Sequence, residues 1–419
     1  MLSDSDASKR SRRVWLHACA LAACAVLAAA TEAPGQLKVE APKRYFGNVP
    51  FTLNPTQGPS FTAQHLLEDT NLVVLHFDFW GIPWASFMAD EPLPSAWVAS
   101  MDAIQELRDE LGLPVFLALT PIAGSRNGLA PEARGTDFLT LDEFFSPPCE
   151  RIHDRPDADE LRVAYGNYVD YMVGRFDPIF LAISIEVNLY AQYCPGAWDD
   201  MKALLNDVYE TQKAEHPGLP VFNTFHIDSM WEAGESEDCF GFTTECLDAN
   251  LIALRDLETD LFAISSYPLG PYDQNGASLP SYWISIFAER TGKPLAIAET
   301  GFQARSLTVE NPATPGECFV GLPSSPGAQT RYLQQVLADA EALEMPFVTW
   351  WGNHDFIPQD FSQPCRCEVE HPWCDFLNSQ SESDRLIGRF FSTIGLRTYQ
   401  GTPRPALADW QRAVRAALE

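Results

Sequence analysis

The chain has 419 residues, of which 46% are hydrophobic, and its 57 acidic against 28 basic side chains give a formal net charge of −29. The excess of acidic residues argues against nucleic acids and anionic membrane surfaces as partners, because phosphates are bound through Lys and Arg. The apolar fraction is normal for a globular protein and too low for a multi-span membrane protein.

The N-terminus has the composition of an export signal. Basic residues between positions 9 and 13 precede an Ala- and Leu-rich stretch over Val14–Ala30, and polar, Pro-containing sequence follows at once. This order predicts a signal over residues 1–30 rather than a membrane span. Leu21-Ala-Ala-Cys24 resembles a bacterial lipobox, in which Cys24 would be acylated, and cleavage near Ala28–Ala30 without a lipid is the alternative. We expect an exported protein that is periplasmic, extracellular or held at the cell surface only through Cys24.

The chain has 10 cysteines, and two of them lie in the predicted signal. An even number in the remainder of an exported chain predicts disulfides, of which Cys239–Cys246 is the one pairing that we name. A zinc site made by Cys365, Cys367 and Cys374 is the alternative. We favour disulfides because no Cys-x-x-Cys pair with matching partners is present.

Short apolar runs that are rich in β-formers recur along the rest of the chain. Each run is nearly continuous in its apolar character, as strands buried on both faces are. A first strand within Tyr45–Thr52 is followed by runs at Leu72–Phe77, Val115–Leu119, Phe180–Ile185, Val221–Phe225, Leu261–Ser265, Leu295–Ala298 and Phe347–Trp350.

Segments with helical spacing separate these runs. The apolar residues between Met201 and Tyr209, for example, follow the i, i+3, i+4 spacing of one buried face. The other predicted helices are a stripe from Trp97 to Leu111, Tyr165–Phe176, Leu251–Leu257, Tyr282–Arg290, a stripe from Tyr332 to Leu343, and Leu386–Ile394.

Strict β-α alternation predicts a parallel sheet, and eight units favour a (β/α)8 TIM barrel over a doubly wound sheet. We expect residues 31–419 to form this single domain. Two long segments, Pro121–Ala164 and Gln303–Gly327, are predicted to be elaborated βα loops. No Gly-x-Gly-x-x-Gly follows the first strand, which argues against a dinucleotide-binding fold.

Polar residues gather where the predicted strands end, which is where barrel enzymes hold their catalytic groups. Retaining glycosidases need two carboxyl groups about 5–5.5 Å apart, one as nucleophile and one as acid/base. Glu186 and Glu299 are predicted to be this pair. The strand ends are Ser184-Ile-Glu-Val-Asn188, Asn223-Thr-Phe-His226, Ser265-Ser-Tyr-Pro268, Glu299 and Trp350-Trp-Gly-Asn-His354.

These segments resemble clan A of the glycoside hydrolases, barrels with an acid/base Glu after strand four and a nucleophile Glu after strand seven. Lys-Pro-x-x-Ile-x-Glu-Thr-Gly, which ends at Gly301, resembles the nucleophile segment. The closest likeness is to the endo-β-1,4-galactanases of family 53, whose strand-four segment reads Gly-Asn-Glu-Ile-Asn. The resemblance implies Glu299 as nucleophile, Glu186 as acid/base and Tyr267 as a hydrogen-bond partner of the nucleophile.

The resemblance also implies that Trp350 or Trp351 forms the floor of a sugar subsite. At most one of the two should face the sugar, because adjacent strand residues point to opposite sides. The clan has Asn directly before the acid/base Glu, but this chain has Ile185, and Asn188 is the candidate to compensate. Further candidates for substrate contact are Asn223, His226 and His354.

We therefore expect a monomeric retaining glycosidase that cleaves a β-linked galactan, mannan or glucan by double displacement and needs no metal or cofactor. A catalytically inactive glycan-binding barrel is the alternative, and Ile185 motivates it. A metal-dependent barrel of the amidohydrolase type needs His-x-His on the first strand, and Tyr45–Thr52 contains no His.

Overall fold

The computed structural model describes residues 42–50, 58–78, 80–133, 148–231, 244–268, 282–311, 313–314, 316–358, 365–379 and 382–419. The predicted export signal, with Cys24, lies outside the described residues, and so does Cys239. Residues from Pro42 to Glu419 belong to one compact unit. Within the described ranges, no helix combines the length and the apolar character needed to cross a membrane.

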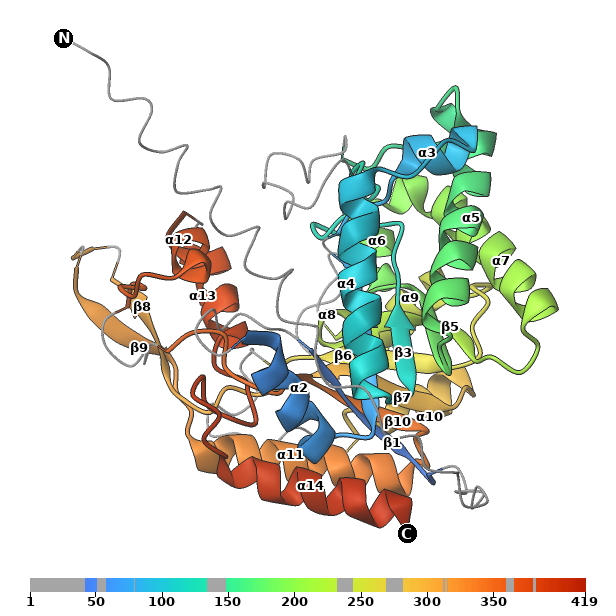
Figure 1. Ribbon diagram of the computed structural model, residues 1–419. Helices are drawn as coiled ribbons and strands as arrows, with labels where there is room; N and C mark the ends of the chain where they lie inside the picture. Colours follow the sequence, from blue (N-terminus) through green and yellow to red (C-terminus); the bar gives the residue numbers. More distant parts are fainter. Residues whose placement is uncertain are drawn as a thin grey trace. The chain divides into compact units, whose positions relative to one another are not determined.

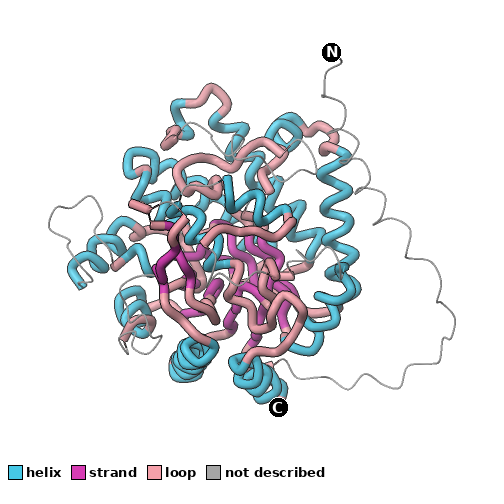
Figure 2. Tube along the Cα trace, turned by 90° about the vertical axis from the view of Figure 1, so that its left-hand side faces the viewer, coloured by secondary structure: helices cyan, strands magenta, loops and turns pink. Residues whose placement is uncertain are grey.

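Eight parallel strands close into a barrel in which neighbours along the chain are neighbours in space, in the order β1-β10-β7-β6-β5-β4-β3-β2. Helices surround the strands (Figures 1 and 2). The predicted TIM barrel is confirmed, and each predicted strand overlaps an observed one. The strands are β1 (Tyr45–Val49), β2 (Leu72–His76), β3 (Val115–Ala118), β4 (Phe180–Ser184), β5 (Val221–His226), β6 (Phe262–Ser266), β7 (Leu295–Thr300) and β10 (Phe347–Gly352).

Each predicted helix overlaps an observed one, with bounds that differ by a few residues. The prediction of a helix over Leu251–Leu257 is correct only for its first three residues, because α9 ends at Ala253 and the chain turns through Asp256 at a φ of 69°. The helices are α2 (Gly58–Asp69), α3 (Trp84–Ala89), α4 (Ser95–Leu111), α5 (Ala158–Phe176), α6 (Val187–Tyr193), α7 (Trp198–Glu215), α8 (Ile227–Met230), α9 (Thr244–Ala253), α10 (Ser285–Thr291), α11 (Pro326–Ala342), α12 (Pro372–Ser379), α13 (Glu382–Phe391) and α14 (Pro405–Leu418), with short 3-10 turns at Ile152–Asp154 and Pro195–Ala197.

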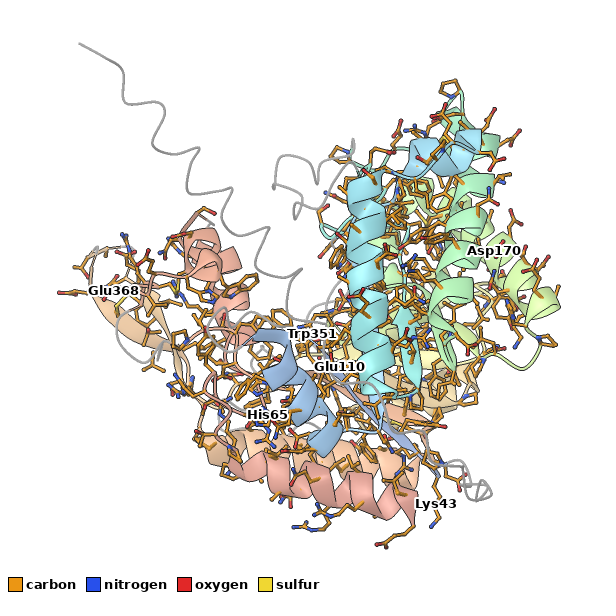
Figure 3. The ribbon with its side chains drawn as sticks, in the orientation of Figure 1. Lys43, His65, Glu110, Asp170, Trp351 and Glu368 are labelled. Carbon is orange, nitrogen blue, oxygen red and sulfur yellow. A yellow bond between two sulfur atoms is a disulfide. The ribbon has the colours of Figure 1, made fainter. Side chains whose placement is uncertain are left out.

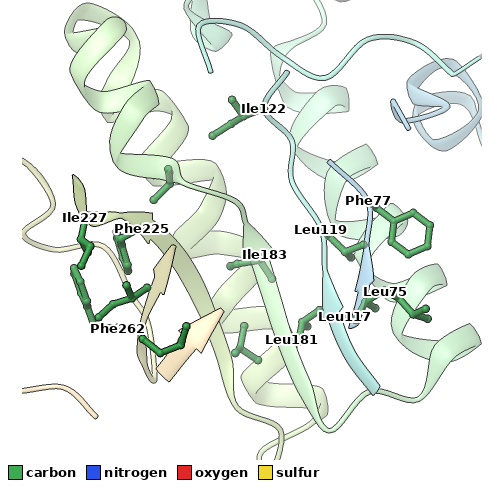
Figure 4. Packing of buried hydrophobic residues seen from close by; sticks show 14 of the residues in the cluster. Leu75, Phe77, Leu117, Leu119, Ile122, Leu181, Ile183, Phe225, Ile227 and Phe262 are labelled. Atoms are coloured by element: carbon green, nitrogen blue, oxygen red, sulfur yellow. The ribbon is translucent and has the colours of Figure 1, made fainter. Parts of the chain in front are cut away.

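Strand side chains alternate between two buried layers, as the pleat of a strand requires. Leu75, Leu117 and Leu181 belong to the layer between the strands and the helices, which side chains fill (Figure 4). Val74 and Phe116 belong to the layer inside the barrel. This inner packing is why the strands are apolar on both faces and could be recognised as continuous runs.

The loops after β7 and β10 carry structure of their own. The loop after β7 holds the antiparallel pair β8 (Leu307–Glu310) and β9 (Cys318–Leu322), and the segment after β10 holds α12 and α13. Figure 1 shows these elements together at one side of the view. Elaboration of the loop after β7 was predicted, but its strands were not, because two four- to five-residue strands give little periodic signal.

Three disulfides lie within the described residues: Cys149–Cys194, Cys318–Cys365 and Cys367–Cys374. The zinc alternative is wrong, because each of its three cysteines is part of a disulfide. Cys246 is buried, and the partner predicted for it lies outside the described residues.

Candidate active site

Glu299 stands at the end of the barrel where the strands finish, which we call the mouth. Between Ile297 and Thr300, β7 has one more residue than β6 on one side and β10 on the other. Such a bulge re-aims a side chain. Thr300 remains on the helix side, where its hydroxyl bonds to that of Tyr332. Glu299 is thereby turned toward the barrel interior.

Both carboxylate oxygens of Glu299 have a partner. The Tyr267 hydroxyl donates to Oε2 over 2.9 Å, which is the hydrogen bond that the clan A resemblance implies. Nε2 of His76 lies 2.8 Å from Oε1. Glu299 is only 5% exposed. These contacts hold the carboxylate in one orientation, as a nucleophile requires.

Glu186 lies two residues past the end of β4 and has a φ of 50°, in the left-handed region that non-glycine residues rarely adopt. Its backbone N–H donates to Oγ1 of Thr224 over 2.8 Å, which ties this strained turn to β5. Ile185, one residue earlier, is fully buried in the inner layer. The turn therefore points Ile185 into the core and leaves the Glu186 carboxyl, 12% exposed, at the mouth.

Arg126, from the loop after β3, joins Glu186 to Asp78 at the end of β2. Its Nη2 lies 2.9 Å from Oε2 of Glu186 and 2.7 Å from Oδ2 of Asp78. Nε donates a second hydrogen bond to Glu186, and Nη1 donates a second one to Asp78. Burial opposes the charge of Arg126, but Asp78 and Glu186 together raise its pKa, so the guanidinium stays protonated.

Tyr267 connects the two glutamates electrostatically. Burial raises the pKa of its phenol, and the negative charges of Glu299 and then Glu186 raise it further. The phenol therefore stays protonated and available as a donor.

Asp228 lies behind Tyr267, at the start of α8. Its carboxylate accepts from the Tyr267 backbone N–H over 2.6 Å and from the Ser266 hydroxyl over 3.0 Å. Burial raises the pKa of Asp228, the nearby His226 lowers it, and Glu186 raises it again. Nε2 of His226 lies 3.8 Å from the Asp228 carboxylate. His226 is thus placed at the mouth, with a quarter of its side chain exposed.

The two tryptophans of β10 face opposite sides, as expected. Trp351 packs inside, its ring edge-on to that of His76 with centroids 4.6 Å apart. Trp350 is fully buried on the helix side and donates from Nε1 to the Ile394 carbonyl over 2.8 Å. The structure therefore brings Trp351 next to His76, the partner of Glu299, and leaves Trp350 on the helix side.

Two predicted substrate contacts are engaged within the protein. Asn188 is buried and bridges the loops after β4 and β5 by bonding the backbone N–H and C=O of His226. Asn223 is fully buried on the helix side, where it bonds the Ser184 hydroxyl and the Glu258 carbonyl. The amides of both residues are already used, so Asn188 does not compensate for Ile185 as the structure stands.

His354 contacts neither glutamate. Its Nε2 lies 3.0 Å from Nδ1 of His65, which projects from α2 (Figure 3). Burial lowers the pKa of His354 to about 3, so its imidazole is neutral near pH 7. The structure thus places His354 in a packed pair of histidines rather than beside Glu186 or Glu299.

The sequence interpretation did not single out three residues that the structure brings to the site: His76, Arg126 and Asp228. His76 ends a strand, as the predicted candidates do, and that signal could have found it. Arg126 and Asp228 lie in loop or short-helix positions with no local pattern that marks them.

Comparison of the sequence with protein-family models and with curated proteins finds no match. Solved structures do match. An exo-β-1,4-mannosidase from Opitutaceae bacterium strain TAV5 is 13% identical with a TM-score of 0.54, over 89% of this chain and 60% of that one. A family 5 glycoside hydrolase from Bifidobacterium longum, in complex with Manβ1-4GlcNAc, is 14% identical with a TM-score of 0.52, over 89% and 78%.

A fungal β-1,4-galactanase matches 88% of this chain and 94% of its own at 14% identity and a TM-score of 0.48. The chain spans 35% of the length of a Bacteroides uniformis β-glucuronidase and 50% of one from Dictyoglomus thermophilum. At these identities the likeness concerns the fold alone, a (β/α)8 barrel that this chain shares with the mannosidase and the family 5 enzyme.

Proposed function

We propose that the protein is a retaining glycoside hydrolase that acts on a β-linked glycan of the galactan, mannan or glucan type. The observation that carries this proposal is the setting of Glu299 at the mouth, where Tyr267 donates to Oε2 and His76 lies against Oε1. Glu186, which follows a different strand and is 12% exposed, supplies the second carboxyl group that a two-glutamate mechanism needs.

In this mechanism Glu299 attacks the anomeric carbon while Glu186 gives its proton to the departing glycosidic oxygen, and a glycosyl ester forms on Glu299. Glu186 then takes a proton from water, and the water oxygen attacks the same carbon and releases Glu299. Tyr267 and His76 orient the Glu299 carboxylate. The mechanism needs no metal or cofactor.

The charge of the site supports a neutral glycan as substrate. Asp78, Glu186, Asp228 and Glu299 are acidic, whereas the cation Arg126 is already bound to two of them. An anionic sugar would meet repulsion here and find Arg126 occupied.

Three disulfides support export, since such bonds persist in oxidising compartments. We therefore propose that the chain is exported by its N-terminal signal, with Cys24 as the candidate lipid-anchoring residue, and that it works as a monomer.

The first test measures release of reducing ends from β-1,4-galactan, β-mannan and β-glucan. Glu299→Gln and Glu186→Gln are each expected to lower kcat by at least about 10²-fold. Glu210→Gln, an exposed position on α7, is the control and should retain full activity. Trapping with 2-deoxy-2-fluoro β-glycosides, followed by peptide mass spectrometry, is expected to label Glu299.

The alternative is a catalytically inactive barrel that binds glycans. Ile185 in place of Asn, together with the ion pair between Glu186 and Arg126, favours it. Glycan binding with no reducing-end release and no labelling of Glu299 would establish that alternative.

A further inference from the structure

We propose that Asp78 is a positioning residue of this site: by binding Arg126 with two hydrogen bonds, it leaves Glu186 able to take up and release a proton. This inference rests on the proposed glycosidase function, in which Glu186 is the acid/base.

One cation, Arg126, forms ion pairs with two carboxylates, those of Asp78 and Glu186. The side chains of Arg126 and Asp78 are 8% and 3% exposed, and they face each other through two parallel hydrogen bonds. Glu186 shares the same guanidinium through Oε2 alone. Among the described residues, the other oxygen of Glu186, Oε1, has no hydrogen-bond partner. Oε1 is therefore the atom on which the transferred proton would sit.

An acid/base glutamate must exist in both protonation states during each turnover. A buried guanidinium bound to Glu186 alone would strongly favour the carboxylate and make it a poor acid. Asp78 supplies the opposing charge. When Glu186 is protonated, Arg126 and Asp78 remain as a neutral bidentate pair, and when Glu186 is ionised, Nε and Nη2 of Arg126 stabilise its charge. Neither state leaves a buried charge without a partner.

The other titratable groups of the site lie on different elements. Asp228 on α8 is buried, which raises its pKa, Tyr267 after β6 stays neutral, and His226 at the end of β5 lies beside Asp228. The Glu186 backbone is held by Thr224. Arg126 is thus the one cation bound to Glu186 among the described residues. Asp78 binds the same guanidinium and so partly neutralises the charge that Glu186 meets.

The experiment compares the pH dependence of kcat/KM for the full chain and two variants on an unactivated β-glycoside. Asp78→Asn removes the opposing charge, and its alkaline limb should move to lower pH by about one unit or more, the size typical of one nearby charge. Arg126→Gln leaves two carboxylates together, and its alkaline limb should move to higher pH. Opposite shifts from two members of one cluster would not follow from a merely structural role.

Asp355→Asn is the matched control. Asp355 and Arg404 form an equally buried ion pair, each 5% exposed, in which Asp355 contacts neither glutamate. This variant should lose stability and keep the wild-type pH profile. An aryl glycoside with an acidic phenol needs little acid assistance, so Asp78→Asn should lose less activity on it than on the unactivated substrate.

Active variants whose alkaline limbs coincide with that of the wild type would overturn the role of Asp78 and leave the proposed function intact. If Asp78→Asn does not fold, the profile of Arg126→Gln decides the question by the same criterion. A wild-type protein that hydrolyses no β-glycoside would instead overturn the proposed function, and the role of Asp78 with it.

Discussion

Nε2 of His76 lies 2.8 Å from Oε1 of Glu299, although β2 and β7 are not neighbours in the barrel. The contact therefore crosses the interior of the mouth. The ring of Trp351 packs edge-on against His76 and fixes it from a third strand. A residue that no motif marked thus holds the proposed nucleophile.

Replacing His76 tests that contact. His76→Leu should lower kcat by roughly 10- to 150-fold with a smaller effect on KM, because a hydrogen bond to a charged group contributes about 1.5–3 kcal/mol. Steady-state kinetics on the best β-glycan would measure this. His216→Gln, at the exposed end of α7, is the control. An unchanged kcat in His76→Leu would show that His76 is only a packing residue.

Tyr267→Phe removes one oxygen from the site and keeps the ring. We expect kcat to fall by about tenfold or more, because Glu299 loses its Oε2 donor. Tyr165→Phe is the matched control, since its buried hydroxyl donates to the Ile183 carbonyl on the helix side. The two variants should unfold at similar temperatures, and equal activities would contradict an orienting role for Tyr267.

The disulfide Cys149–Cys194 joins the loop after β3, which carries Arg126, to the end of α6. It spans 45 residues, whereas Cys367–Cys374 spans 7. Longer closed loops restrict the unfolded chain more, so replacing both cysteines of the first pair by Ser should cost about 2–4 kcal/mol and the second pair less. Urea unfolding of the two double variants measures the difference, and the reverse order would refute this ranking.

Acid stability should depend on His354. Burial lowers its pKa from an ordinary 6.5 to about 3, and its Nδ1 has no partner among the described residues. Between these two values the unfolded chain binds a proton that the folded chain does not, so stability falls as pH drops from 6.5 to 3. Urea midpoints should fall less steeply over this window in His354→Gln than in the wild type. His216→Gln should behave like the wild type, and identical slopes in all three proteins would contradict the assignment.

The order of strands was predictable because each strand is buried on both faces and so reads as one apolar run. The residues at which strands end were harder to predict. The sequence pattern predicts that β7 ends at Ala298, but the strand continues through Glu299 to Thr300. Hydrophobic pattern marks the core, whereas the last polar residues of a strand belong to it only through backbone pairing with β6 and β10.

The residues of the candidate site also fall into those that the sequence could predict and those that it could not. Glu299 and Tyr267 could be proposed from segments of a few residues. Trp350 and Asn223 could not be separated from Trp351 and His226, because which residue faces inward depends on register and on bulges. Arg126 could not be found at all, since its partners lie 48 and 60 residues away.

The sequence by itself determined the barrel and the two glutamates at its strand ends, because short-range periodicity and strand-end chemistry are local properties of the chain. Only the tertiary structure decided what surrounds those glutamates. The bulge in β7, the contact of His76 with Glu299 across 223 residues, and the sharing of Arg126 between Asp78 and Glu186 all arise when the sheet closes. Closure brings charges from distant strands into one buried space, where their interactions become strong.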